Sequence, residues 1–226
     1  MQEICFVHVP KTGGNSLLVD SVAALGTPEI AVEGPNFVTY RVVQRPDLAL
    51  THIGHNARIH NYMTIAQYKK QHPDCFAFAF ARNPYDRLVS AFHYLNKGGM
   101  NTEDWREGIE YLSRYRGDFR RFVLDAFGGT EPPRIFRQMH LRPQVHWLCD
   151  ETGRVVVDCL GHFESMHSTY EEVGRRVGIT LPVPSHVNKS QHAGYETYYD
   201  ETLRSLVARA YRDDFERLGY PISSLS

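Results

Sequence analysis

The chain has 226 residues, 42% of them hydrophobic, which is enough to bury a sizeable core within one domain. We therefore expect a single globular domain over residues 1–226. The 25 basic and 26 acidic residues leave a formal net charge of -1, which excludes a global basic field that would recruit nucleic acid or an anionic membrane. Any anionic ligand must therefore be held by local geometry.

The cysteines and the apolar stretches bear on the cellular setting. The four cysteines show no C-x-x-C spacing and are too sparse for a disulfide scaffold. Cys149 and Cys159 can face each other across a hairpin, and whether they pair stays open. The sequence shows no secretory leader and no stretch near the roughly 20 apolar residues that span a bilayer. These features predict a cytoplasmic protein without a membrane span, whose oligomeric state stays open.

The chain opens with ICFVHVPKTGGNSLL, which predicts a strand over residues 4–9, a loop over 10–14 and a helix over 16–25. Such a loop aims unpaired backbone N–H groups and the positive end of the helix dipole at one point, which attracts phosphate or sulfate. The phosphate loop of ATPases and GTPases reads G-x-x-x-x-G-K-[ST]. Here Lys11 precedes the glycine pair, so the sequence is P-loop-like but matches that loop poorly.

The next predicted elements lead to a buried strand. A short strand is expected near residues 37–43 and a helix over 64–71. The run CFAFAFA that follows does not alternate, which indicates a strand covered on both faces, as in a parallel sheet. Arg82 then lies at the carboxyl end of that strand, and Pro84 suits the first turn of the next helix.

The second half of the chain is mainly helical. Residues 102–127 predict one or two polar helices, with breaks at Gly117 and Gly128. WLCDETGRVVVDCLGHFE predicts a hairpin with its turn at 150–153, and helical spacing returns over 164–177. The last segment predicts one amphipathic helix, with apolar residues at Leu203, Leu206, Val207, Ala210 and Tyr211. Together these elements predict an α/β fold with a central parallel sheet and helices on both faces.

Two groups suited to anions follow strands of this predicted sheet. The Lys11 loop follows the first strand and Arg82 follows the buried one, so both lie at the rim where parallel strands end. Arg82 offers a forked guanidinium to a phosphate dianion, and Ser90, about two turns into the next helix, adds a hydroxyl. The ligand then carries two separate anionic groups. For Arg82 alone, the structural alternatives are an ion pair with Asp86 or a position on a solvated loop.

The segments PKTGGNS and RNPYDRLVSAFHYL resemble the paired cofactor motifs of the sulfotransferases, in particular the carbohydrate O-sulfotransferases such as the uronyl 2-O-sulfotransferases. HLRPQVHWL, DCLGHFE and the C-terminal segment from HVNKS onward resemble the same family, so the resemblance covers nearly the whole chain. It implies one sulfotransferase domain that uses 3′-phosphoadenosine 5′-phosphosulfate (PAPS) and releases adenosine 3′,5′-bisphosphate.

The resemblance also implies roles for individual residues. Arg82 and Ser90 bind the 3′-phosphate, and Lys189 in HVNKS either reaches the nucleotide or lies on a solvated loop. His162 stands where the family often has arginine, and Asn15 where it usually has threonine. Six consecutive residues of the first motif bind the 5′-phosphosulfate: Lys11, Thr12, Gly13, Gly14, Asn15 and Ser16.

Sulfuryl transfer moves a group in line between an attacking and a leaving oxygen, so positioning and charge stabilisation contribute most of the catalysis. Lys11 is the expected partner for charge on the leaving phosphate oxygen. The acceptor hydroxyl also needs a base, and THIGHNARIH supplies His52, His55 and His60. Because Gly54 and His55 resemble the Gly-His segment of the uronyl enzymes, we predict His55 as the base and His52 as the second candidate. The histidine spacing is not a strong zinc signature, so no metal is expected.

Two further groups have both a structural and a functional interpretation. In the cluster before the predicted hairpin, a structural role is slightly favoured over acceptor contact: His140, Arg142, Gln144 and His146. A basic run either forms a solvated face or recognises an acidic acceptor: Arg114, Arg116, Arg120 and Arg121.

The acceptor must carry a hydroxyl, and both a glycan and a small-molecule secondary metabolite stay open. Two other functions stay open as well. One is a P-loop-type nucleotide kinase, against which the displaced Lys11 argues. The other is a module that binds the anionic ligand without transferring a group.

Overall fold

The computed structural model describes residues 2–13, 25–26, 28–33, 37–54, 64–131, 133–181 and 194–222. Contacts group the chain into two compact units, one of Met1–Arg82 with Gln144–Lys189 and one of Asn83–Pro143 with Ser190–Ser226. Each unit contains its own cluster of buried apolar side chains. The prediction of one domain over residues 1–226 stays a prediction.

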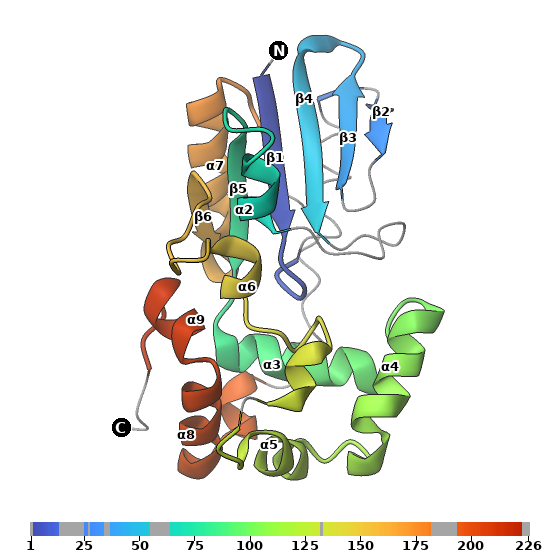
Figure 1. Cartoon of the computed structure of the whole chain (residues 1–226), viewed down its shortest axis with the longest axis vertical. Coiled ribbons are helices and arrows are strands. Elements are labelled where there is room, and N and C mark those ends of the chain that lie inside the picture. The colour runs from blue at the N-terminus through green and yellow to red at the C-terminus, as the bar shows by residue number, and fades with distance from the viewer. Residues whose placement is uncertain are drawn as a thin grey trace. The chain divides into compact units, whose positions relative to one another are not determined.

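A six-stranded sheet forms the centre of the first unit, in the order β2-β3-β4-β1-β5-β6 (Figure 1). Its strands are β1 (Gln2–His8), β2 (Pro28–Glu33), β3 (Phe37–Val42), β4 (Arg45–Gly54), β5 (Phe76–Ala81) and β6 (Cys159–His162). β4, β1, β5 and β6 pair in parallel, whereas β2 with β3 and β3 with β4 pair antiparallel. The predicted α/β class with a mostly parallel sheet is confirmed, and two antiparallel strands extend one edge.

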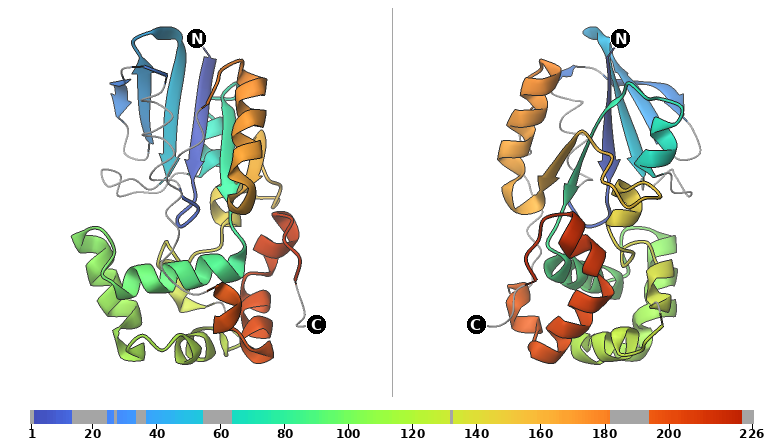
Figure 2. Two further views of the ribbon diagram at one scale, coloured as in Figure 1. Left: turned by 180° about the vertical axis from the view of Figure 1, so that it is seen from behind. Right: turned by 60° about the vertical axis from the view of Figure 1, so that its left-hand side comes forward.

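Helices cover both faces of this sheet, as predicted (Figure 2). Because side chains alternate along a strand, Phe6 and Phe80 point to the face on which α7 (Met166–Val177) packs with Tyr170. On the opposite face, Tyr68 of α2 (Ile65–Lys69) donates its hydroxyl to Glu3. α6 (Val145–Leu148) packs beside α2. The non-alternating apolar pattern of β5 follows from this coverage of both faces.

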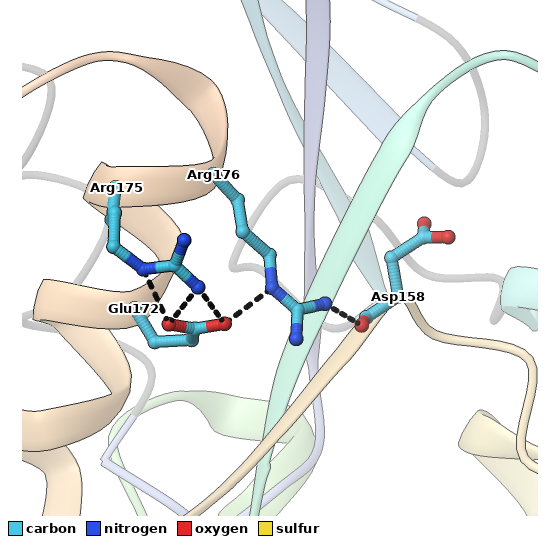
Figure 3. Close-up of polar contacts among 4 residues, drawn as sticks. All are labelled: Asp158, Glu172, Arg175 and Arg176. Atoms are coloured by element: carbon cyan, nitrogen blue, oxygen red, sulfur yellow. Dashed lines mark hydrogen bonds and ion pairs between the residues drawn. The ribbon is translucent and has the colours of Figure 1, made fainter.

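Asp158 connects both helix layers to the edge of the sheet. One of its carboxylate oxygens accepts hydrogen bonds from the Ala77 N–H at 2.8 Å and from Lys69 Nζ of α2 at 2.6 Å. Its backbone carbonyl accepts a hydrogen bond from Arg176 Nη1 of α7 at 2.8 Å, and Arg176 also pairs with Glu172 (Figure 3). Asp158, which directly precedes β6, therefore holds α2, α7 and β5 together.

The described part of the second unit consists of helices and loops. Its helices are α3 (Pro84–Asn96), α4 (Thr102–Leu112), α5 (Phe119–Phe127), α8 (Glu201–Ala210) and α9 (Arg212–Arg217). Short 3-10 turns are η1 (Ser113–Tyr115), η2 (Arg134–Arg137) and η4 (Tyr195–Tyr198), and η3 (Phe163–Ser165) belongs to the first unit. Aromatic rings dominate the core, and the buried Tyr211 hydroxyl donates to the Leu141 carbonyl at 2.6 Å.

Two expectations about local structure need correction. The single C-terminal helix is two helices, because the backbone leaves helical geometry at Tyr211 (φ -109°, ψ 27°). The predicted hairpin is reduced to one bridge between Cys149 and Val155, since the chain beyond Val155 continues into β6 and pairs with β5 in parallel. β2 and β4 were not predicted. The helix expected over residues 16–25 lies outside the described residues except for its last residue, which is helical.

All four cysteines are free, so Cys149 and Cys159 are not joined. Cys5 and Cys75 are both buried, and a hydrogen bond with Cys75 together with burial raises the pKa of the Cys5 thiol. Among the residues that the structure describes, no helix combines the length and the apolar character needed to cross a bilayer.

We expect Asp158→Ala to lower the free energy of unfolding by about 1–2 kcal/mol, because the Ala77 N–H loses its acceptor and Lys69 loses its partner. Urea denaturation measures the change. Glu151→Ala is the matched control, since the side chains of the Lys70–Glu151 pair are 69% and 92% exposed and the change should stay below about 0.5 kcal/mol. Equal effects of the two substitutions would show that Asp158 does not hold the sheet edge.

Candidate functional site

Four parallel strands of the first unit end at one edge of the sheet. His8 is paired with Gly54 at the end of β4, and Val7 with Ala79 near the end of β5. Ala81, the last residue of β5, is paired with His162, the last residue of β6. Because the strands are parallel, the segments that follow them emerge at the same edge. The prediction that the Lys11 loop and Arg82 share a rim is confirmed.

The loop after β1 has a tightly specified backbone. Lys11 has a φ of 70° and Gly13 a φ of 85°. This left-handed conformation is unfavourable for a lysine, and such strain persists only where surrounding contacts hold it. Thr12 is fully buried, and its hydroxyl donates to the Val9 carbonyl at 2.8 Å. The Thr12 side chain therefore stabilises the loop itself.

Arg82 lies against this loop. Its side chain is 6% exposed, and its Nη1 donates to the Lys11 carbonyl at 3.2 Å. The guanidinium carbon lies 4.5 Å from the centre of the Phe163 ring, which is a cation–π distance. The structure therefore brings together the two predicted anion-binding groups, Arg82 and the loop.

Gln144 fixes the backbone of Arg82. Its side chain is fully buried, its Oε1 accepts from the Arg82 N–H at 2.9 Å, and its Nε2 donates to the Arg82 carbonyl at 2.8 Å. The amide thus extends the hydrogen-bonding pattern of β5 by one residue, as a neighbouring strand would. These hydrogen bonds support the structural interpretation of Gln144. The residue that Gln144 holds, Arg82, is itself a predicted site residue.

The predicted bases lie on and after β4. His52 is buried, and its ring stacks on Phe6 and His8, with centroid distances of 5.7 Å and 5.3 Å. His8 was missed in the sequence, although it stands only three residues before Lys11. His55 and His60 lie outside the described residues.

Other predicted binding residues are placed only in part. Ser90 is buried in α3 of the second unit. Four predicted binding residues lie outside the described residues: Gly14, Asn15, Ser16 and Lys189.

The cluster of residues expected either to contact the acceptor or to be structural mostly contacts neighbouring residues of the chain. Buried His140 hydrogen-bonds through Nδ1 with Gln138 at 2.9 Å. Arg142 donates to the carbonyls of Phe136 and Arg137. His146 packs edge-on against the ring of its neighbour Trp147. These contacts support the structural interpretation.

The basic run of the second unit is partly neutralised by acidic neighbours. Arg114 pairs with Asp125, and Arg120 pairs with Asp200. These pairs favour a solvated face over recognition of an acidic acceptor. In the described ranges of the chain, no three His, Cys, Asp or Glu side chains gather closely enough to hold a metal ion.

The comparison with protein families decides the class. The model of the sulfotransferase family matches residues 2–221 of the chain. The chain belongs to the sulfotransferase family. This sulfotransferase is therefore an enzyme of the transferase class, and its family activity is sulfuryl transfer. Comparisons with curated proteins and with solved structures gave no significant match.

We expect Thr12→Val to lower the free energy of unfolding of this sulfotransferase by about 1–2 kcal/mol. A methyl group then replaces the hydroxyl that donates a hydrogen bond to the Val9 carbonyl. Urea denaturation measures the loss. Thr12→Ser keeps the hydroxyl and should recover most of the stability. If valine is tolerated as well as serine, the hydroxyl does not hold the loop.

Proposed function

We propose that this sulfotransferase transfers the sulfuryl group of PAPS to the hydroxyl of an acceptor. The contact between Arg82 Nη1 and the Lys11 carbonyl carries the proposal, since it brings the two anion-binding groups of the predicted donor site together at one sheet edge. The family generally uses PAPS as its sulfate donor. PAPS carries two separate anionic groups, which matches the two binding groups.

Different residues of the donor site are assigned to the two ends of the nucleotide. The 5′-phosphosulfate is assigned to the loop from Lys11 to Ser16, and the 3′-phosphate to Arg82 and Ser90, with Lys189 as a further contact. Because Thr12 is fully buried and its hydroxyl already donates to Val9, its part in the site is assigned to holding the loop whose main-chain N–H groups meet the anion. Main-chain N–H groups and a guanidinium are chemically suited to phosphate and sulfate oxygens.

The transfer step needs an in-line acceptor oxygen and a base. Lys11 is assigned to the charge that develops on the leaving phosphate oxygen. His55, which directly follows Gly54 at the end of β4 in the sequence, is assigned as the base. His52 is the second candidate, and its 5% exposure between Phe6 and His8 limits its access to an acceptor. A base of this kind contributes on the order of 10²–10⁴ in rate.

The acceptor is assigned to the carbohydrates, because the sequence resembles the uronyl 2-O-sulfotransferases. A small-molecule secondary metabolite is the alternative acceptor. A screen with radiolabelled PAPS against both classes distinguishes them, since transfer of label to only one class would exclude the other.

We expect calorimetry to show micromolar binding of adenosine 3′,5′-bisphosphate and no comparable binding of magnesium-ATP. Lys11→Ala and Arg82→Ala should each weaken bisphosphate binding by about tenfold or more, as expected when a charged hydrogen-bond partner is removed. Arg121→Ala removes an exposed arginine of α5 and serves as the control that should bind as tightly as the wild type. Preference for magnesium-ATP would contradict PAPS as donor and favour a kinase.

With an acceptor from the screen, we expect His55→Ala to reduce the rate of sulfuryl transfer by about 10²–10⁴ at saturating PAPS, because the acceptor hydroxyl loses its base. Single-turnover transfer of label measures the rate. Transfer that survives His55→Ala but is lost in His52→Ala would assign the base to His52. Full activity of both variants would contradict histidine as the base.

A further inference from the structure

Phe163 has no part in the donor contacts or in the transfer step assigned above. It directly follows His162, the last residue of β6, which is paired with Ala81. Phe163 therefore leaves the sheet at the same edge as Arg82, one strand away. Its ring is partly buried against the apolar cluster beneath α7, so the core fixes its position.

The Phe163 ring supports the Arg82 guanidinium. The guanidinium carbon lies 4.5 Å from the ring centroid, while Nη1 donates to the Lys11 carbonyl. A guanidinium that lies over an aromatic ring keeps its N–H groups available in its own plane. The ring thus restricts the positions that the Arg82 guanidinium can take beside the Lys11 loop.

The same ring also lies against the backbone of the Lys11 loop. A Cβ atom added at Gly13 would come within 3.0 Å of Phe163 Cε2 and 3.7 Å of the terminal methyl of Met166. Gly13 also has a φ of 85°, which favours glycine independently. The loop therefore packs on Phe163 at the position where even an added Cβ atom would crowd the ring.

We propose that Phe163 is a positioning residue for the donor site, whose single rigid ring sets both the Arg82 guanidinium and the turn at Gly13. This inference rests on the proposed function, because it assigns the role of Phe163 within the PAPS site. Phe163 itself needs no contact with the anion. Its two contacts join the group assigned to the 3′-phosphate and the loop assigned to the 5′-phosphosulfate, so losing the ring disturbs both ends together.

Phe163→Leu tests the role, because leucine keeps an apolar side chain but removes the flat ring under Arg82. We expect the Kd of adenosine 3′,5′-bisphosphate, measured by calorimetry, to rise by about fivefold to tenfold, as a lost cation–π contact and a loosened loop predict. Phe163→Tyr keeps the ring and should recover most of the affinity. Hydrogen exchange at the amides of residues 11–13 should be faster in the leucine variant than in the wild type, without nucleotide present.

Phe76→Leu is the matched control for lost packing, since Phe76 is also partly buried against the same apolar cluster but lies at the opposite end of β5. Both leucine variants should lower the melting temperature by a similar few degrees. Only Phe163→Leu should weaken binding and speed exchange in the loop. Equal behaviour of the two variants in both measurements would overturn the proposal.

The two proposals fail in different ways. If the wild type does not bind the bisphosphate, PAPS as donor is contradicted, and hydrogen exchange in the loop still tests the role of Phe163. If the wild type binds and Phe163→Leu binds equally well with unchanged exchange, the donor proposal stands and the positioning role is refuted.

Discussion

The parallel register of β4, β1, β5 and β6 is the constraint on which the candidate site depends. It makes four strands end level, so that segments far apart in the chain meet at one edge of the sheet. The packing on the two covered faces of β5 fixes this register, because a shift by one residue would exchange the large Phe side chains packed against α7 with the small Ala side chains of the other face. The packing that forms the hydrophobic core of the first unit therefore also sets the geometry of its site.

The strained backbone at Lys11 shows how the rest of the site is stabilised. A positive φ at a lysine has an unfavourable free energy of roughly 1 kcal/mol or more, and the loop must recover it from its surroundings. Thr12 donates a hydrogen bond to the Val9 carbonyl, and Arg82 donates one to the Lys11 carbonyl. The loop is thus held before any anion arrives, which reduces the conformational entropy lost on binding.

The features that the sequence predicted well depend on local signals. The non-alternating run in β5 identified a strand covered on both faces, and the helical spacing predicted up to residue 177 matches the end of α7 at Val177. β4 escaped prediction because it contains Pro46 and gains its stability from pairing with β1 and β3. The contacts of Arg82 with Gln144 and Phe163 escaped it for a similar reason. They join residues far apart in the chain and follow only from the register of the folded sheet.

The pairing of Gln144 with the backbone of Arg82 separates folding from chemistry at that position. These two hydrogen bonds of Gln144 reach the N–H and the carbonyl of position 82, which every residue except proline carries, so this support does not depend on which side chain stands there. Evolution can therefore exchange the guanidinium for another group while keeping the end of β5 intact. The backbone at the end of β5 therefore stays in place when the side chain at position 82 changes, so ligand preference can change without a new fold.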